Sequence, residues 1–508
     1  MSLSTPSDAT SGVAANAGGA LSRRQLGVAD IVFFIVAASA PLTVVAGGVS
    51  STYLVTGNAG VPLLFLVLGG ILALFVAGYA AMSHHITNAG AFYAYVSQGL
   101  GRVGGVATAF VALVSYNAMQ IGISGLFGAV FAGFMLDKTG IDLSWWAWIF
   151  VAIALIGVLG WLRIDLNAKL LAIFLTTEII VVAVFDLVVI GDPGPQGMSF
   201  QGFDPTIAFG AGLGAALVFS TAAFTGFESA AIYSEECKNP RKTVAKATYI
   251  ALGITSLFYA FSALMLANAV GPDTATSAEA LVRGGFTTPD GAAPDPTTIL
   301  FIVLDGQIST FVADVAVLLF CTSLFAAMLS FHNAVARYGY ALGRAKVLPS
   351  VFARVRPSTG SPFVGSAAQS VLAFVVVAIF ALSGSDPILE LFTWLTNLGA
   401  LGVLALLALS SFAVIGYFAK RAHDEGAWAT RIAPALAGVL LTIVFVLALF
   451  NFNVLITGAQ DAPLDDRSVI LPALLFIAAA VGAAVGFRMK KSRPDDYATI
   501  GAHYEERE

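Results

Sequence analysis

The chain has 508 residues, of which 58% are hydrophobic and only 11% are charged, and its mean hydropathy is +0.87. Soluble domains carry about 25% charged residues, so this composition excludes an ordinary soluble protein. The net charge of −5 is too small to indicate a nucleic-acid partner. Two cysteines, Cys237 and Cys321, exclude a disulfide framework or a zinc cluster, and we expect both to be small buried packing residues.

The chain begins with a stretch rich in Ser, Ala and Gly that lacks an apolar core. Residues 1–25 are therefore predicted to form a disordered cytoplasmic tail instead of a signal peptide. After this tail, apolar runs of about 20 residues alternate with short polar loops, which predicts an all-α polytopic membrane protein with twelve spans. The runs lie at 28–55, 61–83, 104–134, 145–162, 168–190, 207–234, 245–270, 308–340, 363–384, 388–418, 431–452 and 468–488.

The basic residues predict the orientation of these spans. If the N-terminus is cytoplasmic, the outer loops keep only Lys138, Arg283 and Arg467, and the inner loops receive nearly all other Lys and Arg residues. The reversed topology would place almost every basic residue on the wrong side of the membrane. The sequence therefore predicts a multi-pass protein of the plasma or inner membrane with both termini in the cytoplasm.

Two of the predicted spans are interrupted. In span one, residues 38–43 contain Pro41, which removes a backbone donor and clashes with the preceding turn. In span six, Thr225 and Gly226 break the helix directly before Glu228, and a charged residue at membrane depth is normally functional. The first break alone is also compatible with a simple proline kink. Two breaks five spans apart, however, are typical of transporters built from inverted repeats, which bind substrate between the broken helices.

Three motifs resemble those of the amino acid–polyamine–organocation superfamily of permeases. The most specific is the span-six block, GFE at 226–228 and EECKNPR at 235–241, which is similar to the family's G-[FV]-E…E-E-x-x-N-P-x-[RK] run. NAGAFYAY at 88–95 resembles the S-G-G-x-Y-x-Y entry to the third helix, and the run from 336 to 349 resembles S-R-x-x-Y-A-x-[AG]-R-D-G-x-L-P. The resemblance covers about residues 25–490.

The resemblance implies a leucine-transporter-like fold. Residues 26–190 (spans 1–5) and 207–418 (spans 6–10) would form the two inverted repeats, followed by two further spans at 431–488 and a cytoplasmic tail at 489–508. Substrate would lie between the two broken helices, where exposed amides and carbonyls receive the carboxylate and amino groups of an amino acid. Carried over by position, the substrate-binding residues are Ala38, Ser39, Ala40, Thr43, Gln120, Ala222, Ala223, Phe224, Thr225 and Gly226.

Three features depart from the family pattern. Span one has Ala-Ser-Ala-Pro in place of the G-S-G of many members, so the backbone is expected to approach the ligand less closely. Ala222 stands where several members have a gating tryptophan, which leaves Phe219 or Phe224 as the aromatic lid. Glu178 replaces the lysine of the family's I-F-x-A-A-K run, whose ammonium group stands in for a sodium ion between spans one and five.

We expect Glu178, Glu228 and Phe219 to serve in coupling or gating. A carboxyl group among apolar helices favours its neutral form, so Glu178 is predicted to carry a proton. It is alternatively predicted to contact a cationic group on the substrate, or only to hydrogen-bond a neighbouring helix. Glu228 could instead cap the second half of span six, and Gln120 is as well suited to joining two helices as to binding substrate.

These features predict a secondary active transporter that takes up amino acids by alternating access, with the proton as coupling ion. A polyamine or organic-amine importer and an amino acid exchanger are the alternatives. A channel should show a selectivity filter or charged ring, and none is visible. An enzyme would need a nucleophile–base pair or metal ligands, but the sequence has no H-E-x-x-H motif, and without a P-loop ATP-driven pumping has no support. We therefore expect no catalytic residue, cofactor, metal or nucleic acid. The expected partners are an amino acid or amine substrate, the proton and the bilayer, for a monomer or homodimer.

Overall fold

The computed structural model describes residues 26–162, 164–287, 291, 293–459 and 462–501. The described chain is helical apart from its loops, and one isolated β-bridge joins Leu26 to Cys237. The tail predicted at 1–25 lies outside the described residues, as does the part of the 489–508 tail beyond Gly501. In the described part of that second tail, the last span continues to Ser492 and a short helix follows.

Every predicted apolar run coincides with a helix or with the parts of a broken helix. Span one consists of α1 (Val28–Ser39), α2 (Pro41–Thr43), the π-helix η1 (Val44–Val49) and α3 (Ser50–Thr56). Span six consists of α10 (Leu213–Ala222) and the 3₁₀ segments η3 (Phe227–Ala231) and η4 (Ser234–Glu236). The other spans are α4 (Val61–His85), α6 (Arg102–Thr139), α7 (Trp145–Trp161), α8 (Ile164–Gly191), α11 (Pro240–Val270), α14 (Thr310–Arg344), α15 (Phe363–Leu382), η7 with α16 (Pro387–Phe392, Thr393–Phe418), η8 with α17 (Trp428–Ile432, Ala433–Phe450) and α19 (Asp466–Ser492).

Shorter helices lie in the connections between the spans. They are α5 (Phe92–Gly99), η2 (Gln201–Phe203), α9 (Pro205–Ala208), α12 (Ala278–Arg283), η5 (Pro296–Thr298), α13 (Ile299–Gln307), η6 (Ser350–Ala353), α18 (Phe452–Thr457) and α20 (Pro494–Thr499). In the described chain, eleven helical segments are long and apolar enough to cross a membrane, whereas α7 has only 17 residues. The number of twelve crossings therefore stays a prediction.

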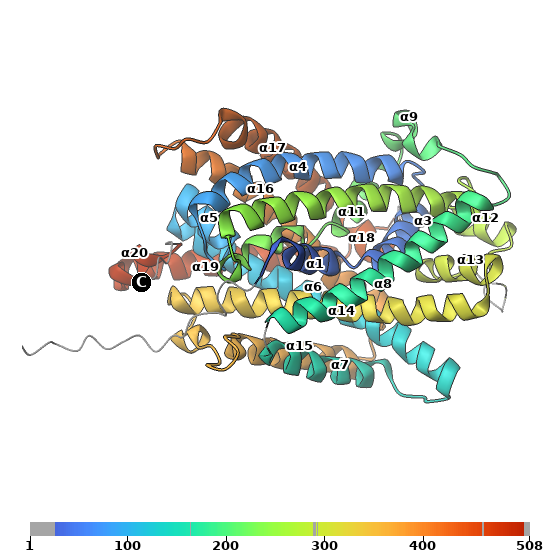
Figure 1. Cartoon of the computed structure of the whole chain (residues 1–508), viewed down its shortest axis with the longest axis horizontal. Helices are drawn as coiled ribbons and strands as arrows, with labels where there is room; N and C mark the ends of the chain where they lie inside the picture. Colours follow the sequence, from blue (N-terminus) through green and yellow to red (C-terminus); the bar gives the residue numbers. More distant parts are fainter. Residues whose placement is uncertain (1–25, 163, 288–290, 292, 460–461, 502–508) are drawn as a thin grey trace, which may run out of the picture.

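The long helices run side by side along the long axis of the molecule, with α1 near the middle (Figure 1). The pair α7 and α15 lies at one edge of this view and α17 at the opposite edge. α14 is buried on every face between Ala326 and Gly343, as expected for a helix inside a bundle. In contrast, α15 and α19 expose large apolar side chains such as Phe374 and Phe476, which suits helices that contact lipid.

Candidate substrate site

The break in span one follows from the residues on either side of Ala40. α1 ends at Ser39, and Ala40 adopts the left-handed conformation with φ 51°. Pro41 has no backbone N–H to donate. The N–H of Leu42 would bond to the carbonyl of Ala38 in a continuous helix, but that bond is not formed here, and the N–H faces the carboxylate of Glu178. The carbonyl group of Ala38 therefore loses its usual helical donor.

Glu178 of α8 connects three helices at this break. Its carboxylate is fully buried and also accepts a hydrogen bond from Ser323 Oγ of α14 at 2.7 Å. The hydroxyl of Thr43, just after the break, donates in turn to Ser323 Oγ at 3.3 Å. Span one is thus joined to α14 and α8 by a chain of two hydrogen bonds, from Thr43 to Ser323 and from Ser323 to Glu178.

The break in span six has a similar outcome with different residues. After α10, the amides of Phe224 and Thr225 bond three residues back, to Thr221 at 3.0 Å and to Ala222 at 3.1 Å. The next amide in this series, that of Gly226, would reach the carbonyl of Ala223. It donates instead to the carboxylate of Glu228 at 2.9 Å, so the Ala223 carbonyl loses its donor.

Gly226 and Glu228 are both fixed by their surroundings. Gly226 has φ 112°, a conformation that side chains disfavour, and a Cβ atom there would lie 2.6 Å from Cβ of Ala38. Glu228 is fully buried and accepts a second hydrogen bond from the hydroxyl of Tyr116 at 2.9 Å. The hydroxyl of Tyr79 donates to the backbone carbonyl of Glu228 and accepts from the N–H of Ala231 at 3.1 Å. The break in span six is thus held in place by two tyrosines and its own glutamate.

A cavity of about 160 Å³ lies between the two breaks. Ala38 and Ala223, the residues whose carbonyls lost their helical donors, both line it. Its polar side chains are Ser and Thr hydroxyls and one amide, and no charged side chain lines it in the described part of the chain. The lining residues are Ala38, Ser39, Ala40, Thr43, Val44, Gly47, Gly48, Ser51, Phe65, Met119, Ile123, Leu126, Phe219, Ala222, Ala223, Thr225, Thr297, Ala327, Phe392, Thr393, Thr396 and Asn397.

Most of the residues predicted to bind substrate are brought together here. Those that line the cavity are Ala38, Ser39, Ala40, Thr43, Ala222, Ala223 and Thr225, together with the predicted lid residue Phe219. Phe224 points elsewhere and packs against Phe65 and Tyr259, with ring centroids 5.9 and 6.1 Å away. Gly226 contacts span one behind the cavity. Gln120 lies outside the cavity, where its Oε1 accepts from Nε2 of Gln369 at 2.7 Å.

The predicted coupling residues Glu178 and Glu228 also lie outside the cavity, each behind one break. The structure adds a polar group from α16 that the sequence analysis did not single out, formed by Thr393, Thr396 and Asn397. Their spacing places them on one helical face at the start of an otherwise apolar run, but such side chains also bond within their own helix, so the spacing alone does not identify a cavity. α8 carries another buried acid, Asp186, which lies away from the cavity, accepts from Ser262 Oγ at 2.8 Å and was also missed.

One end of the bundle is closed by buried charges. Arg337 of α14 forms a double hydrogen bond with Glu236, which includes Nη2 to Oε1 at 3.0 Å, and both side chains are almost fully buried. Leu26 pairs with the same segment through backbone bonds to Glu236 at 3.1 Å and Lys238 at 2.9 Å. This closure ties the start of span one to the end of span six.

The described residues contain no group of three His, Cys, Asp or Glu side chains that could hold a metal ion. Both cysteines are free and buried. The arrangement is therefore a neutral, partly apolar cavity between two opened helices, with one carbonyl of each break unclaimed by its helix.

The family model of amino acid permeases matches residues 26–481, nearly the whole described chain. The chain belongs to this family. It is therefore a membrane transporter and not an enzyme. Among curated relatives, it is 25% identical to the methylthioribose transporter of Bacillus subtilis, over 78% of this chain and 83% of that protein. It is 24% identical to the branched-chain amino acid permease BcaP of the same organism, over 86% and 90%.

Solved structures support the predicted fold class. A Na⁺-coupled sialic acid symporter in its outward-open state matches with a TM-score of 0.55 and 14% identity, over 91% of this chain and 90% of that one. The manganese transporter of Eremococcus coleocola, in complex with a bis-isothiourea compound, matches with a TM-score of 0.52 and 16% identity, over 94% and 98%. At such identities the likeness shows the fold alone. The prediction of a leucine-transporter-like, all-α fold is thereby confirmed.

Proposed function

We propose that this permease takes up amino acids across the cell membrane by alternating access, with the proton as coupling ion. The observation that carries the proposal is that Ala38 and Ala223, whose carbonyl groups lose their helical donors, both line one neutral cavity. Carbonyl oxygens at the end of a half-helix suit a substrate ammonium group. Phe65, Met119 and Ile123 then offer an apolar wall to an uncharged side chain.

Glu178 is our proposed proton carrier. Its protonation would remove a buried negative charge next to the backbone of span one and would weaken its attraction for the Leu42 amide that faces it. Leu42 and Ser323 lie on different helices, so a change in charge at Glu178 changes how span one is held to α14. A change of several kcal/mol for a buried charge is enough to bias which way a carrier faces.

A second candidate, an importer of amines without a carboxylate, is favoured by a different observation. At the start of the outer half of span one, Pro41 has no backbone N–H, and the N–H of Leu42 faces the carboxylate of Glu178. The Ala40 amide is bonded within α1, to Val36 and Ala37. Few donors are therefore left for a substrate carboxylate, and no Lys or Arg lines the cavity in the described residues.

Two ligands that differ only in the carboxylate distinguish these candidates. Because a ligand stabilises the folded state, we would compare the thermal unfolding of the purified protein with leucine and with 3-methylbutylamine, its decarboxylated form. Stabilisation by leucine supports an amino acid permease. Stabilisation by the amine alone supports the second candidate, and no shift with either ligand or with a wider set of amino acids contradicts both.

Counterflow tests the transport mechanism. Proteoliposomes loaded with unlabelled substrate are expected to accumulate radiolabelled substrate transiently, because a carrier reorients faster when its site is occupied. A channel shows no such trans-stimulation, so its absence with a bound substrate would contradict alternating access.

We also propose the repeat boundaries 26–190 and 207–418 and the cytoplasmic location of both termini, on the basic-residue distribution described above. In a variant with Cys237 and Cys321 replaced by Ser, single cysteines at Lys242 and Arg354 are expected to resist membrane-impermeant reagents added outside. Cysteines in the 273–287 loop should react. Labelling of position 242 from outside would overturn both the orientation and the repeat assignment.

A further inference from the structure

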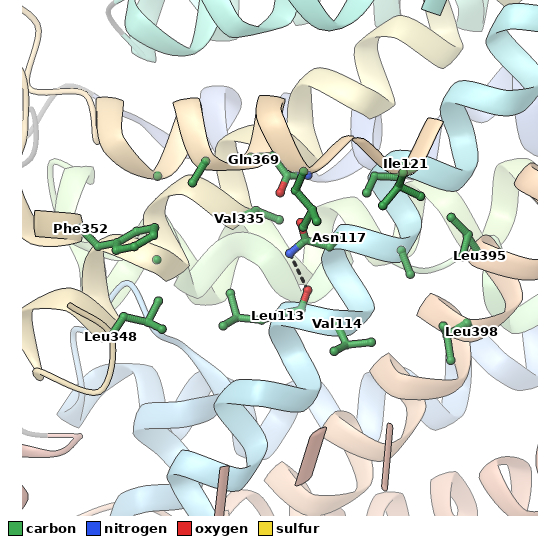
Figure 2. Close-up of a pocket in the computed structure, with 16 residues that line it drawn as sticks. Leu113, Val114, Asn117, Ile121, Val335, Leu348, Phe352, Gln369, Leu395 and Leu398 are labelled. Atoms are coloured by element: carbon green, nitrogen blue, oxygen red, sulfur yellow. Dashed lines mark hydrogen bonds between the residues drawn. The ribbon is translucent and has the colours of Figure 1, made fainter. Parts of the chain in front are cut away.

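A second cavity, of about 430 Å³, lies on the far side of α6 and α16 from the substrate cavity. We call it the lateral cavity (Figure 2). Its volume falls within the range of about 300–1,000 Å³ that is usual for small-molecule sites. Its walls come from α6, α14, α15, α16 and the segment after α14, with the apolar side chains of Leu113, Val335, Phe352, Leu372, Leu395 and Leu398.

The mouth of the lateral cavity faces the bilayer. Leu372 of α15 lines the cavity and is 43% exposed, and the next residues on this helix, Phe374 and Val375, are 50% and 46% exposed. These side chains lie inside an apolar segment long enough to cross a membrane, so their exposed surface contacts hydrocarbon. A molecule that fills this cavity therefore enters from the lipid.

Two polar groups face this otherwise apolar space. Gln369 of α15 is 2% exposed and donates its Nε2 to Gln120, but its Oε1 has no hydrogen-bond partner in the described chain. Asn117 of α6 donates its Nδ2 to the carbonyl of Leu113 at 2.7 Å, and its Oδ1 also has no partner in the described chain. Figure 2 shows both carboxamides near the middle of the lining. A buried amide oxygen without a donor is unfavourable, so a ligand that supplies one is preferred to a plain hydrocarbon chain.

We infer that the lateral cavity binds a neutral amphiphile from the membrane, whose hydroxyl group contacts Gln369 and Asn117 and whose hydrocarbon body fills the apolar walls. A hydroxyl group both donates and accepts, so it matches a carboxamide in either orientation. No charged side chain lines the lateral cavity in the described residues, so nothing there pairs with a phosphate head group. The ligand class is therefore a long-chain alcohol or an uncharged hydroxylated lipid.

The two cavities share their walls. On α6, Ala118 and Ile121 face the lateral cavity, whereas Met119 and Ile123 face the substrate cavity. On α16, Leu395 faces the lateral cavity and Thr396 faces the substrate cavity. A bound amphiphile thus touches the backs of the two helices that line the substrate cavity.

Photolabelling in liposomes tests this inference without any transport measurement. The full-length protein in phosphatidylcholine liposomes would be exposed to a diazirine-bearing long-chain alcohol, or to the same chain without its hydroxyl. Labelled peptides would then be mapped by mass spectrometry. We expect the alcohol to label residues 113–121 and 365–376 at least tenfold more than the hydrocarbon does. Equal labelling by the two probes, or alcohol labelling only elsewhere, would overturn the inference.

Three variants locate the contact. Gln369→Leu is expected to reduce labelling by the alcohol to the level of the hydrocarbon, and Ala368→Phe, at an exposed lining position, should fill the cavity and suppress both probes. Ser370→Ala is the matched control, because Ser370 faces Gly157 of α7 instead of the cavity, and it should label as the unchanged protein does. Alcohol selectivity that persists in Gln369→Leu contradicts the proposed contact. Should that variant fail to fold, undiminished labelling of Ala368→Phe contradicts the site.

Discussion

The two broken helices expose their carbonyl groups by different means. In span one a single left-handed residue, Ala40, separates two helical segments, and the chain returns to helix at once. In span six the turn runs from Ala223 to Gly226 and continues as 3₁₀ helix, and no α-helix forms again until Pro240. In each break a buried glutamate faces the amide that the exposed carbonyl would otherwise have bonded, and in span six it accepts a hydrogen bond from that amide.

The origin of that glutamate is the informative difference. Glu228 belongs to the break it holds, so it moves together with Gly226 and stabilises one local conformation. Glu178 comes from another helix and is linked to span one through Ser323 of α14, which also accepts from Thr43. A relative movement of these helices can break the contacts of Glu178 but not the bond between Glu228 and Gly226. We therefore expect Glu178 to act in coupling and Glu228 to act in shaping the site.

Replacement of Gly226 by Leu should have the largest effect. The new side chain would be forced into a conformation with φ 112° and would collide with Ala38, so both breaks would be disturbed together. We expect substrate affinity to fall by more than tenfold, or about 1.4 kcal/mol, in a thermal-shift titration. Gly253→Leu, on α11 where a Cβ meets nothing, should bind normally. Unchanged affinity in Gly226→Leu would contradict the placement of the substrate site between the two breaks.

Glu178→Gln tests the role of the glutamate that crosses an interface. Gln still accepts a hydrogen bond but cannot release a proton, so exchange of substrate between compartments should persist while accumulation driven by a pH gradient is lost. Both activities would be measured in the same proteoliposomes. If the substrate is a diamine whose distal ammonium contacts Glu178, binding itself should weaken. If exchange and pH-driven uptake both survive, Glu178 is only structural.

Glu228→Gln should give a smaller and more uniform loss. Its two carboxylate oxygens accept separately from Gly226 and Tyr116, and an amide supplies only one acceptor oxygen. We expect binding to weaken by about 1 kcal/mol, or roughly fivefold, with exchange and pH-driven uptake reduced in parallel. Tyr116→Phe is the companion variant. A selective loss of pH-driven uptake in Glu228→Gln would move the coupling role from Glu178 to Glu228.

Ala40→Gly should have the smallest effect, and it should be stabilising. A left-handed residue with a side chain costs about 1–2 kcal/mol, and the substitution relieves this strain. Part of the stabilisation is offset because Gly has greater conformational freedom in the unfolded chain. The thermal unfolding midpoint is expected to rise slightly with transport unchanged. Ala37→Gly, inside α1, should lower it. A lower midpoint in Ala40→Gly would mean that the break is not strained at this residue.

The sequence was sufficient for the fold and for the position of both breaks. Apolar runs set the helices, and Pro41 and Gly226 have backbone requirements that a continuous helix cannot meet. The sequence was not sufficient to predict which hydrogen-bond partners the polar side chains at mid-depth have. Tyr116 and Gln120 are one turn apart on α6, yet the first bonds Glu228 and the second bonds Gln369. A helix that is buried on several faces has no polar side to indicate which neighbour each residue meets.

The same limit applies to α16. Its threonines lie in a long apolar run, and a hydroxyl group can satisfy itself on the preceding turn, as Thr396 does with the carbonyl of Phe392 at 2.7 Å. From the sequence, such residues are equally well explained as side chains that hydrogen-bond within their own helix. Only the packing of α16 against the two breaks shows that Thr393, Thr396 and Asn397 face a cavity.

The backbone pairing of Leu26 with the Glu236–Lys238 segment also makes the opening of this end measurable by hydrogen–deuterium exchange. The amide hydrogens of Leu26 and Lys238 are bonded across the closed end, so they exchange with deuterium from solvent only when the two segments separate. Their exchange rates therefore report how often this end opens, and the measurement needs no substrate and no substitution. A substrate that closes the cavity should slow both amides together, and a residue that holds the closed end, such as Arg337, should speed both when it is removed.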